Sequence, residues 1–151
     1  MGSRRALLRT PHVVHVCVYH VVWATKYRRQ VLDLRNTPDG PRVCDRLKEI
    51  AAGIAAENDW TIRALETMPD HVHLFIQADN VTSPRDLANA FKGRTSHVLR
   101  EEFPELKRRL PSLWTRSYFV ATAGDVSAAT IQQYVQNQRT RPTDPKGVGR
   151  A

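Results

Sequence analysis

Hydrophobic and polar residues alternate with two different periods along this chain, and these periods predict strands and helices in turn. Four segments rich in β-branched and aromatic residues carry interleaved polar residues, which is typical of β-strands. These segments are 13–23, 60–66, 71–77 and 113–122. Two other segments repeat apolar residues every three or four positions, which predicts amphipathic helices over residues 41–57 and 83–102.

A last helix is expected after Gly124-Asp125, with Ser127 as its N-cap. The order of elements is then β-α-β-β-α-β-α, which indicates an α+β, ferredoxin-like (βαββαβ) antiparallel sheet with helices on one face and one extra C-terminal helix. We expect an N-terminal arm at 1–11, one domain at 12–139 and a disordered tail at 140–151.

The size and composition suit one ordinary globular domain, with 151 residues and 41% hydrophobic residues. The two cysteines, Cys17 and Cys44, form no Cys-x-x-Cys pair, which favours reduced thiols and an intracellular compartment, with one disulfide between them as the alternative. No apolar run approaches the ~18 residues that a membrane span needs. We therefore expect no membrane partner.

The charge balance favours a polyanionic partner. The chain has 23 Lys and Arg against 15 Asp and Glu, a net charge of +8. Residues 1–35 and 85–116 are net basic, whereas 36–84 are net acidic. In the first basic zone Lys26, Arg28 and Arg29 surround Tyr27. An aromatic ring that can stack on a base, among cations that can bind phosphates, suits single-stranded nucleic acid. The alternative is a solvated loop with a half-buried tyrosine.

Two histidines in the third predicted strand could bind a metal ion. Side chains alternate along a strand, so His71 and His73 project from one face and Val72 and Leu74 from the other. Two neutral imidazoles at this spacing can hold one divalent ion. The alternative is a pair of exposed polar residues. His20, in the first strand, is expected to be a structural or DNA-contacting side chain.

The last predicted helix brings two further polar groups together. Tyr134 and Gln138 are four residues apart, hence on one helix face. A tyrosine is a poor nucleophile at its ordinary pKa near 10, but a nearby cation can stabilise its phenolate. The alternative is that Tyr134 packs against the core and Gln138 is a surface amide.

Five ordered blocks of residues carry a family resemblance. They are Tyr19-His20-Val21-Val22-Trp23 with 26–29, Met68-Pro69-Asp70-His71-Val72-His73-Leu74, Phe91-Lys92-Gly93-Arg94-Thr95-Ser96, Leu113-Trp114 with Ser117-Tyr118-Phe119, and Tyr134 through Gln138. With these blocks the chain closely resembles the HUH single-tyrosine transposases, which comprise TnpA-like insertion-sequence enzymes and their REP-associated tyrosine transposase relatives.

The resemblance implies a role for each candidate residue. His71, His73 and Gln138 match the family's ligands to Mg²⁺ or Mn²⁺, and Tyr134 matches its nucleophile. The implied activity is metal-dependent cleavage and rejoining of single-stranded DNA with hairpin ends, through a 5′-phosphotyrosine. A homodimer acting on DNA in a bacterial or archaeal cytoplasm is also implied.

Two helix cations extend the expected DNA surface. Lys92 and Arg94 lie in the second net-basic zone, and we expect both to contact DNA phosphates.

Two other functions stay open at this point. The first is a domesticated REP-associated relative that processes chromosomal palindromes. The second is a non-catalytic nucleic-acid-binding module, because the same βαββαβ architecture serves RNA-recognition domains. Such a module would need aromatic residues on its central strands. The third predicted strand presents His71 and His73 there, with Phe75 its one aromatic, which favours an enzyme.

Overall fold

The computed structural model describes residues 8–9, 14–15 and 17–122. In chain order the elements are β1 (Leu8–Arg9), β2 (Val14–His15), β3 (Cys17–Ala24), the 3-10 helix η2 (Lys26–Arg28), α1 (Val43–Asn58), β4 (Thr61–Met68), β5 (His71–Ala78), α2 (Pro84–Glu102), α3 (Pro104–Arg109) and β6 (Phe119–Thr122). The predicted C-terminal helix, with Tyr134 and Gln138, lies outside these residues, as do most of the predicted arm and all of the tail.

The main sheet has four antiparallel strands in the order β4-β5-β3-β6. This order, with α1 between β3 and β4 and α2 between β5 and β6, confirms the ferredoxin-like prediction. Strands β4 and β5 form a hairpin across a two-residue turn. Strands β1 and β2 pair separately in a small sheet of their own.

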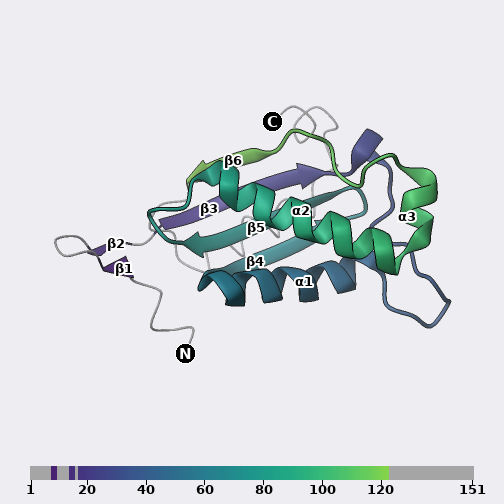
Figure 1. Cartoon of the computed structure of the whole chain (residues 1–151), viewed down its shortest axis with the longest axis horizontal. Helices are drawn as coiled ribbons and strands as arrows, with labels where there is room; N and C mark the ends of the chain where they lie inside the picture. Colours follow the sequence, from purple (N-terminus) through teal and green to yellow (C-terminus); the bar gives the residue numbers. More distant parts are fainter. Residues whose placement is uncertain (1–7, 10–13, 16, 123–151) are drawn as a thin grey trace.

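Helices α1 and α2 lie side by side and cover one face of the sheet (Figure 1). Both begin with a hydrogen bond between a side chain and a backbone N–H group. The Ser83 hydroxyl accepts a hydrogen bond from the Asp86 backbone N–H at 3.0 Å, and Pro84 occupies the first turn. At α1 the Asp45 carboxylate accepts the backbone N–H of Arg42 at 3.0 Å. These caps satisfy N–H groups that a helix start otherwise leaves unpaired.

The central strands divide their side chains between two faces. Val21 of β3 is opposite Leu74 of β5, and both are fully buried in the core beneath the helices. His20 is opposite Phe75, so these two side chains point to the other face of the sheet. The candidate metal ligands lie on that second face.

The predicted strand over 113–122 is wrong in its first half, because only Phe119–Thr122 pairs in the sheet. The preceding backbone groups are used elsewhere. The Leu113 carbonyl accepts the Lys26 N–H at 2.8 Å, and the Thr115 N–H donates to the Ala24 carbonyl at 3.0 Å. The Trp114 indole is buried and donates to Thr95 Oγ1 at 3.0 Å. This segment therefore packs across the end of β3 instead of extending β6.

Two other predicted boundaries need correction. The expected strand over 13–23 is divided into β2 and β3, which belong to different sheets. The end of the helix predicted over 83–102 is followed by a further helix that was not predicted, α3, in which Pro104 occupies the first turn, where proline's fixed φ is compatible with a helix. Among the described residues, no helix combines the length and the apolar character that a membrane crossing requires.

Candidate functional site

The second face of the sheet carries three histidines on two neighbouring strands. His71 and His73 are on β5, and His20 is on β3. His73 is opposite Val22, and Val22 points to the same face as His20 because the two are separated by one residue along β3. The three imidazoles therefore share one face of the sheet. The residues are only 3%, 6% and 8% exposed for His71, His73 and His20 respectively. The alternative of two exposed polar histidines is therefore wrong.

The imidazoles contact one another directly. Nε2 of His20 lies 3.1 Å from Nδ1 of His73, which is hydrogen-bond distance for two ring nitrogens. The rings of His71 and His73 have centroids 5.1 Å apart and an interplanar angle of 72°. The two histidines predicted from spacing are therefore adjacent groups on a single site.

A carboxylate holds the other candidate ligand. Nδ1 of His71 is 2.6 Å from Oδ1 of Asp70, and Oδ2 of Asp70 accepts Nε–H of Arg28 at 3.1 Å. Burial by itself would raise the pKa of Asp70, but the hydrogen bonds from His71 and Arg28 hold it below its usual value. Asp70 is thus ionised at neutral pH and can only accept, so Nδ1 of His71 is the donor.

Burial keeps the imidazoles neutral. It lowers the pKa of His73 to about 3, with further lowering by His71 and His20, and it lowers the pKa of His20 to about 4. Burial also lowers the pKa of His71, while the Asp70 carboxylate opposes that shift. A metal ion binds the neutral imidazole, so the ligating form is present at neutral pH without deprotonation.

The described residues supply part of a metal shell and not all of it. No group of three His, Cys, Asp or Glu side chains in the described part of the chain could by itself hold a metal ion. Two neighbouring neutral imidazoles suit a divalent ion that takes its remaining ligands from elsewhere. Gln138, the third ligand implied by the family resemblance, lies outside the described residues, as does Tyr134.

The basic loop around Tyr27 lies next to this site through Arg28. Tyr27 is 65% exposed, and Nζ of Lys26 lies 5.5 Å from its ring centroid. Tyr27 and Arg28 have φ values of 57° and 54°, a left-handed conformation that strains residues other than glycine. The Thr25 hydroxyl fixes the loop by donating to the Arg29 carbonyl at 2.7 Å. Of the four predicted DNA contacts in this loop, Arg28 is the one whose guanidinium binds the Asp70 carboxylate.

The helix cations predicted to contact DNA are not brought to the histidines. Nζ of Lys92 donates to the carbonyl oxygens of Thr115, Arg116 and Ser117 at 2.7, 3.1 and 3.3 Å. Lys92 therefore holds the irregular segment before β6, a role in the fold that sequence reasoning missed. Its contact with phosphate stays a prediction.

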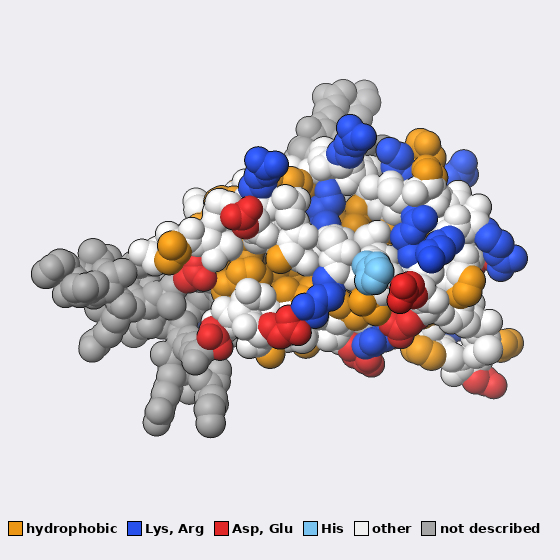
Figure 2. All heavy atoms as spheres, viewed as in Figure 1, with side chains coloured by type: hydrophobic (Ala, Val, Ile, Leu, Met, Phe, Trp, Pro, Cys, Tyr) orange, Lys and Arg blue, Asp and Glu red, His pale blue; other side chains and the backbone are white. Residues whose placement is uncertain are grey.

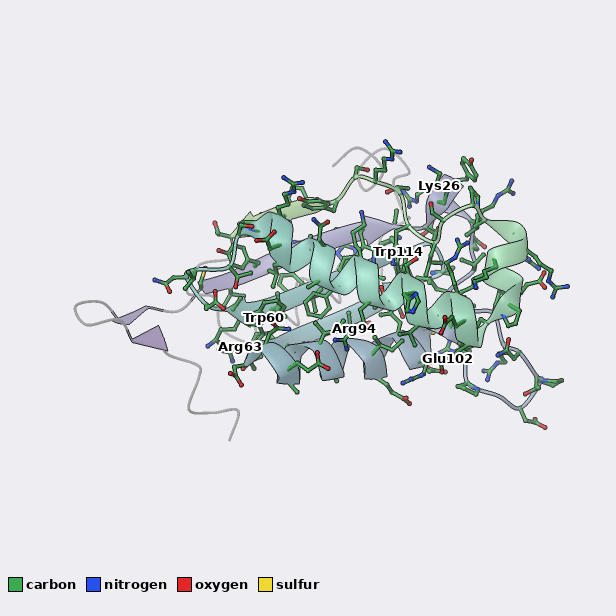
Figure 3. All side chains as sticks on the ribbon, in the orientation of Figure 1. Lys26, Trp60, Arg63, Arg94, Glu102 and Trp114 are labelled. Carbon is green, nitrogen blue, oxygen red and sulfur yellow. The ribbon has the colours of Figure 1, made fainter. Side chains whose placement is uncertain are left out.

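Arg94 lies between α2 and α1, where it forms a bidentate ion pair with Glu57 (Figure 3). Figure 2 shows this helix-covered side of the molecule, on which Lys and Arg gather toward α3 and Asp and Glu lie mostly toward α1. Phosphate contact by Arg94 also stays a prediction.

Asp70 contacts a candidate ligand, His71, and the sequence patterns assign it no role. Its signal was available, because a carboxylate next to a candidate ligand histidine is a common support for that ligand. The contact of His20 with His73 was not readable in the same way, since it depends on how β3 and β5 are aligned. His97, by contrast, is an exposed side chain of α2, far from the chemistry expected here.

Comparisons with known proteins indicate the family of this chain. The family model for IS200-like transposases matches residues 13–138. The ISDra2 transposase TnpA of Deinococcus radiodurans is 35% identical over 130 residues, covering 85% of this chain and 88% of that protein. The transposase for insertion sequence element IS200 of Salmonella typhimurium is 29% identical over 143 residues, covering 91% and 85%.

Solved structures give the same result. A crystal structure from Deinococcus radiodurans R1, assigned as a transposase, is 38% identical with a TM-score of 0.67 and covers 87% of this chain and 97% of that one. A REP-associated tyrosine transposase bound to a REP hairpin is 13% identical with a TM-score of 0.51, covering 86% and 66%, which is a likeness of fold. The chain therefore belongs to the family of IS200-like transposases.

Proposed function

We propose that this transposase cleaves and rejoins single-stranded DNA at hairpin-bearing ends through a 5′-phosphotyrosine on Tyr134. Membership of the family implies DNA cutting and rejoining, and the proposal specifies the strand, the intermediate and the metal. One observation carries it: His71 and His73 are buried, neutral, on one face of β5, and each has its Nδ1 atom already hydrogen-bonded. Nε2 of His71 is therefore left for a metal ion, and Nε2 of His73 is left as well when its proton is on Nδ1.

The metal proposed is Mg²⁺ or Mn²⁺, held by His71, His73 and Gln138. This set of ligands has no carboxylate, unlike most magnesium sites, so phosphate oxygens of the DNA and water would complete the coordination. Affinity in the absence of DNA should accordingly be modest. When bound, the ion would supply positive charge beside the scissile phosphate.

The protein's own chemistry is then a transfer between oxygens. The phenolic oxygen of Tyr134 attacks the phosphorus atom and gives up its proton, while the P–O3′ bond breaks and the 3′ oxygen leaves as a hydroxyl. A phosphodiester is replaced by a phosphotyrosine ester, so no nucleotide hydrolysis is required. Attack by another 3′-OH on that ester reverses the step and rejoins DNA.

The DNA contacts proposed lie on the loop that begins at Lys26. Tyr27 is an exposed ring in a strained backbone conformation, which suits stacking on an unpaired base. Lys26 and Arg29 flank it and suit phosphate contacts, whereas Arg28 contributes through Asp70. A hairpin partner is supported by the REP-associated neighbour, which was solved bound to a hairpin. Action as a homodimer on DNA in the cytoplasm is part of the same proposal.

A trapping assay tests the proposal. Labelled single strands from the flanks of the gene are incubated with the full chain in Mg²⁺, in Mn²⁺ or in EDTA, and denaturing electrophoresis then detects covalent protein–DNA adducts. We expect an adduct that requires the metal and is absent from Tyr134→Phe. A chain that binds the strands in a salt-sensitive way but never forms an adduct would be a binding module instead.

The same assay separates the two kinds of substrate. Adducts with imperfect palindromes at the ends of a mobile element indicate an active transposase. Adducts confined to palindromes dispersed over the chromosome indicate the domesticated relative.

A further inference from the structure

We propose that His20 is a positioning residue for the metal site: its Nε2 accepts a hydrogen bond from Nδ1–H of His73 and so leaves Nε2 of His73 unprotonated, ready to bind the ion. The inference rests on the proposed function, because it concerns a residue that serves the same site. His20 belongs to β3, a different strand from both candidate ligands.

The contact between the two rings allows two arrangements, and only one is compatible with a ligand. Nε2 of His20 and Nδ1 of His73 are 3.1 Å apart. Both imidazoles are neutral at pH 7, since burial lowers the pKa of each, so one nitrogen donates and the other accepts. If His20 donated, the single proton of His73 would sit on Nε2 and block it. If His73 donates, its Nε2 lone pair is available.

The ring of His20 is held in place from both neighbouring strands. It stacks on Phe75 of β5 with a centroid distance of 4.2 Å and an interplanar angle of 4°. Phe119 of β6 meets it edge-on, at 6.0 Å and 74°. His20 itself is 8% exposed. The aromatic contacts fix the plane of the imidazole and therefore the direction of its Nε2 atom toward His73.

The other ligand shows the same arrangement with a different support. Nδ1 of His71 donates to the Asp70 carboxylate at 2.6 Å, and Arg28 binds the second carboxylate oxygen at 3.1 Å. Both candidate ligands thus have Nδ1 engaged and Nε2 left over. A carboxylate can only accept, whereas an imidazole can accept or donate, so the support of His73 depends on the tautomer of His20.

Two substitutions at His20 separate hydrogen bonding from packing. His20→Phe keeps a flat ring that can stack on Phe75 but has no acceptor. His20→Gln loses the ring but can place its amide oxygen near the position of the imidazole Nε2, where it can accept from His73. His97→Gln, at the exposed histidine of α2, removes an imidazole far from the site and serves as the matched control.

The first readout is the tautomer of His73 in metal-free full-length protein, measured by long-range ¹H–¹⁵N correlation NMR. We expect the Nδ1–H form in the wild type, a loss of that preference in His20→Phe, and its retention in His20→Gln. A wild-type His73 with its proton on Nε2 would overturn the proposal without any variant.

The second readout is the affinity for Mn²⁺ by calorimetry. Loss of the partner of a metal-bound histidine costs about 10–100-fold in affinity. We expect a loss of that size in His20→Phe and a clearly smaller one in His20→Gln. Equal affinity in His20→Phe and the wild type, or a greater loss in a folded His20→Gln than in His20→Phe, would assign His20 to packing alone and overturn the proposal.

Failure of the proposed function looks different. Suppose that the wild-type chain forms no metal-dependent adduct, but that His73 has its proton on Nδ1 and His20→Phe abolishes this form. That result would support the positioning contact and contradict the proposed transposase chemistry. Conversely, suppose that a metal-dependent adduct forms equally well in the wild type and in His20→Phe, with the same tautomer of His73 in both. That result would support the proposed chemistry and contradict the positioning role of His20.

Discussion

The two faces of strand β5 are buried to nearly the same extent but serve different purposes. On the helix side Val72, Leu74 and Ile76 are fully buried in the core. On the other side His71 and His73 are 3% and 6% exposed. Burial alone therefore does not separate the core of this protein from its site. What separates them is that each histidine on the second face has a nitrogen atom hydrogen-bonded to a neighbouring side chain.

The difference follows from the chemistry of the two kinds of side chain. Apolar groups gain free energy in proportion to the area removed from water, whatever their neighbours. A buried polar nitrogen gains only if it finds a partner, and its partner also decides where its proton sits. The helix side therefore tolerates a range of apolar residues, whereas the histidine side depends on named neighbours.

The largest effects should come from truncating one residue on each face. Leu74→Ala leaves a cavity in the core and should lower the free energy of unfolding by about 2–5 kcal/mol, measured by denaturant titration.

His73→Ala should abolish Mn²⁺ binding and the DNA adduct, with circular dichroism still showing a folded domain. If His73→Ala bound Mn²⁺ as the wild type does, the division between the two faces would be wrong.

A smaller effect is expected at the carboxylate that supports His71. Asp70→Asn keeps an acceptor but removes the charge and the ion pair with Arg28. Mn²⁺ affinity should fall about 10–100-fold, by the same reasoning as for other partners of ligand histidines. Asp39→Asn, in the exposed loop before α1, is the matched control and should bind Mn²⁺ like the wild type. Equal losses in both variants would mean that overall charge, not the contact with His71, sets the affinity.

The buried imidazoles also predict a pH dependence of stability. Their pKa values are about 3 for His73 and about 4 for His20 in the folded chain, against an ordinary value of 6.5. The unfolded chain therefore binds more protons below pH 6.5, and stability falls as the pH decreases from 6.5 toward 4. The slope is at most about 1.4 kcal/mol per pH unit for each histidine. Unfolding titrations at pH 7 and pH 5 should show the loss in the wild type and a reduced loss in His20→Phe. Equal losses in both proteins would contradict the assignment.

The smallest effect is expected on the helix side, at Arg94. Its ion pair with Glu57 is exposed to solvent, and exposed pairs contribute little to stability. Arg94→Ala should therefore change the free energy of unfolding little. If Arg94 also reaches a phosphate, as the sequence predicts, the dependence of log affinity on log salt should fall by about one. If that slope is the same in Arg94→Ala and the wild type, Arg94 contacts Glu57 and no phosphate, and DNA binds to other surfaces.

Local patterns predicted much of this fold because the physics that sets those elements is local. The alternation over residues 71–77 places both histidines on one face, and the Ser83-Pro84 pair marks the start of α2. The hairpin between β4 and β5 follows from a short turn between two strand-like segments. These features need no knowledge of distant contacts.

The missed features all depend on contacts between distant residues. His20 meets His73 only because β3 and β5 align with Val22 opposite His73, and neither strand's pattern contains that alignment. The segment before β6 reads as a strand, but Lys92, from another element, binds its carbonyl groups. Arg28 reads as a phosphate-binding cation, but it binds Asp70. In each case a partner far along the chain decides the role.

The central claim is that the imidazoles of His71 and His73 bind a divalent ion through Nε2. Pulsed EPR of Mn²⁺ bound to the Tyr134→Phe protein with uncleaved hairpin DNA tests it most directly, because ¹⁵N-labelled histidine makes each coordinating nitrogen visible. The account predicts couplings from two histidine nitrogens, and no histidine coupling in His73→Ala, which no longer binds the ion. Mn²⁺ bound to the complex without any histidine coupling would contradict it.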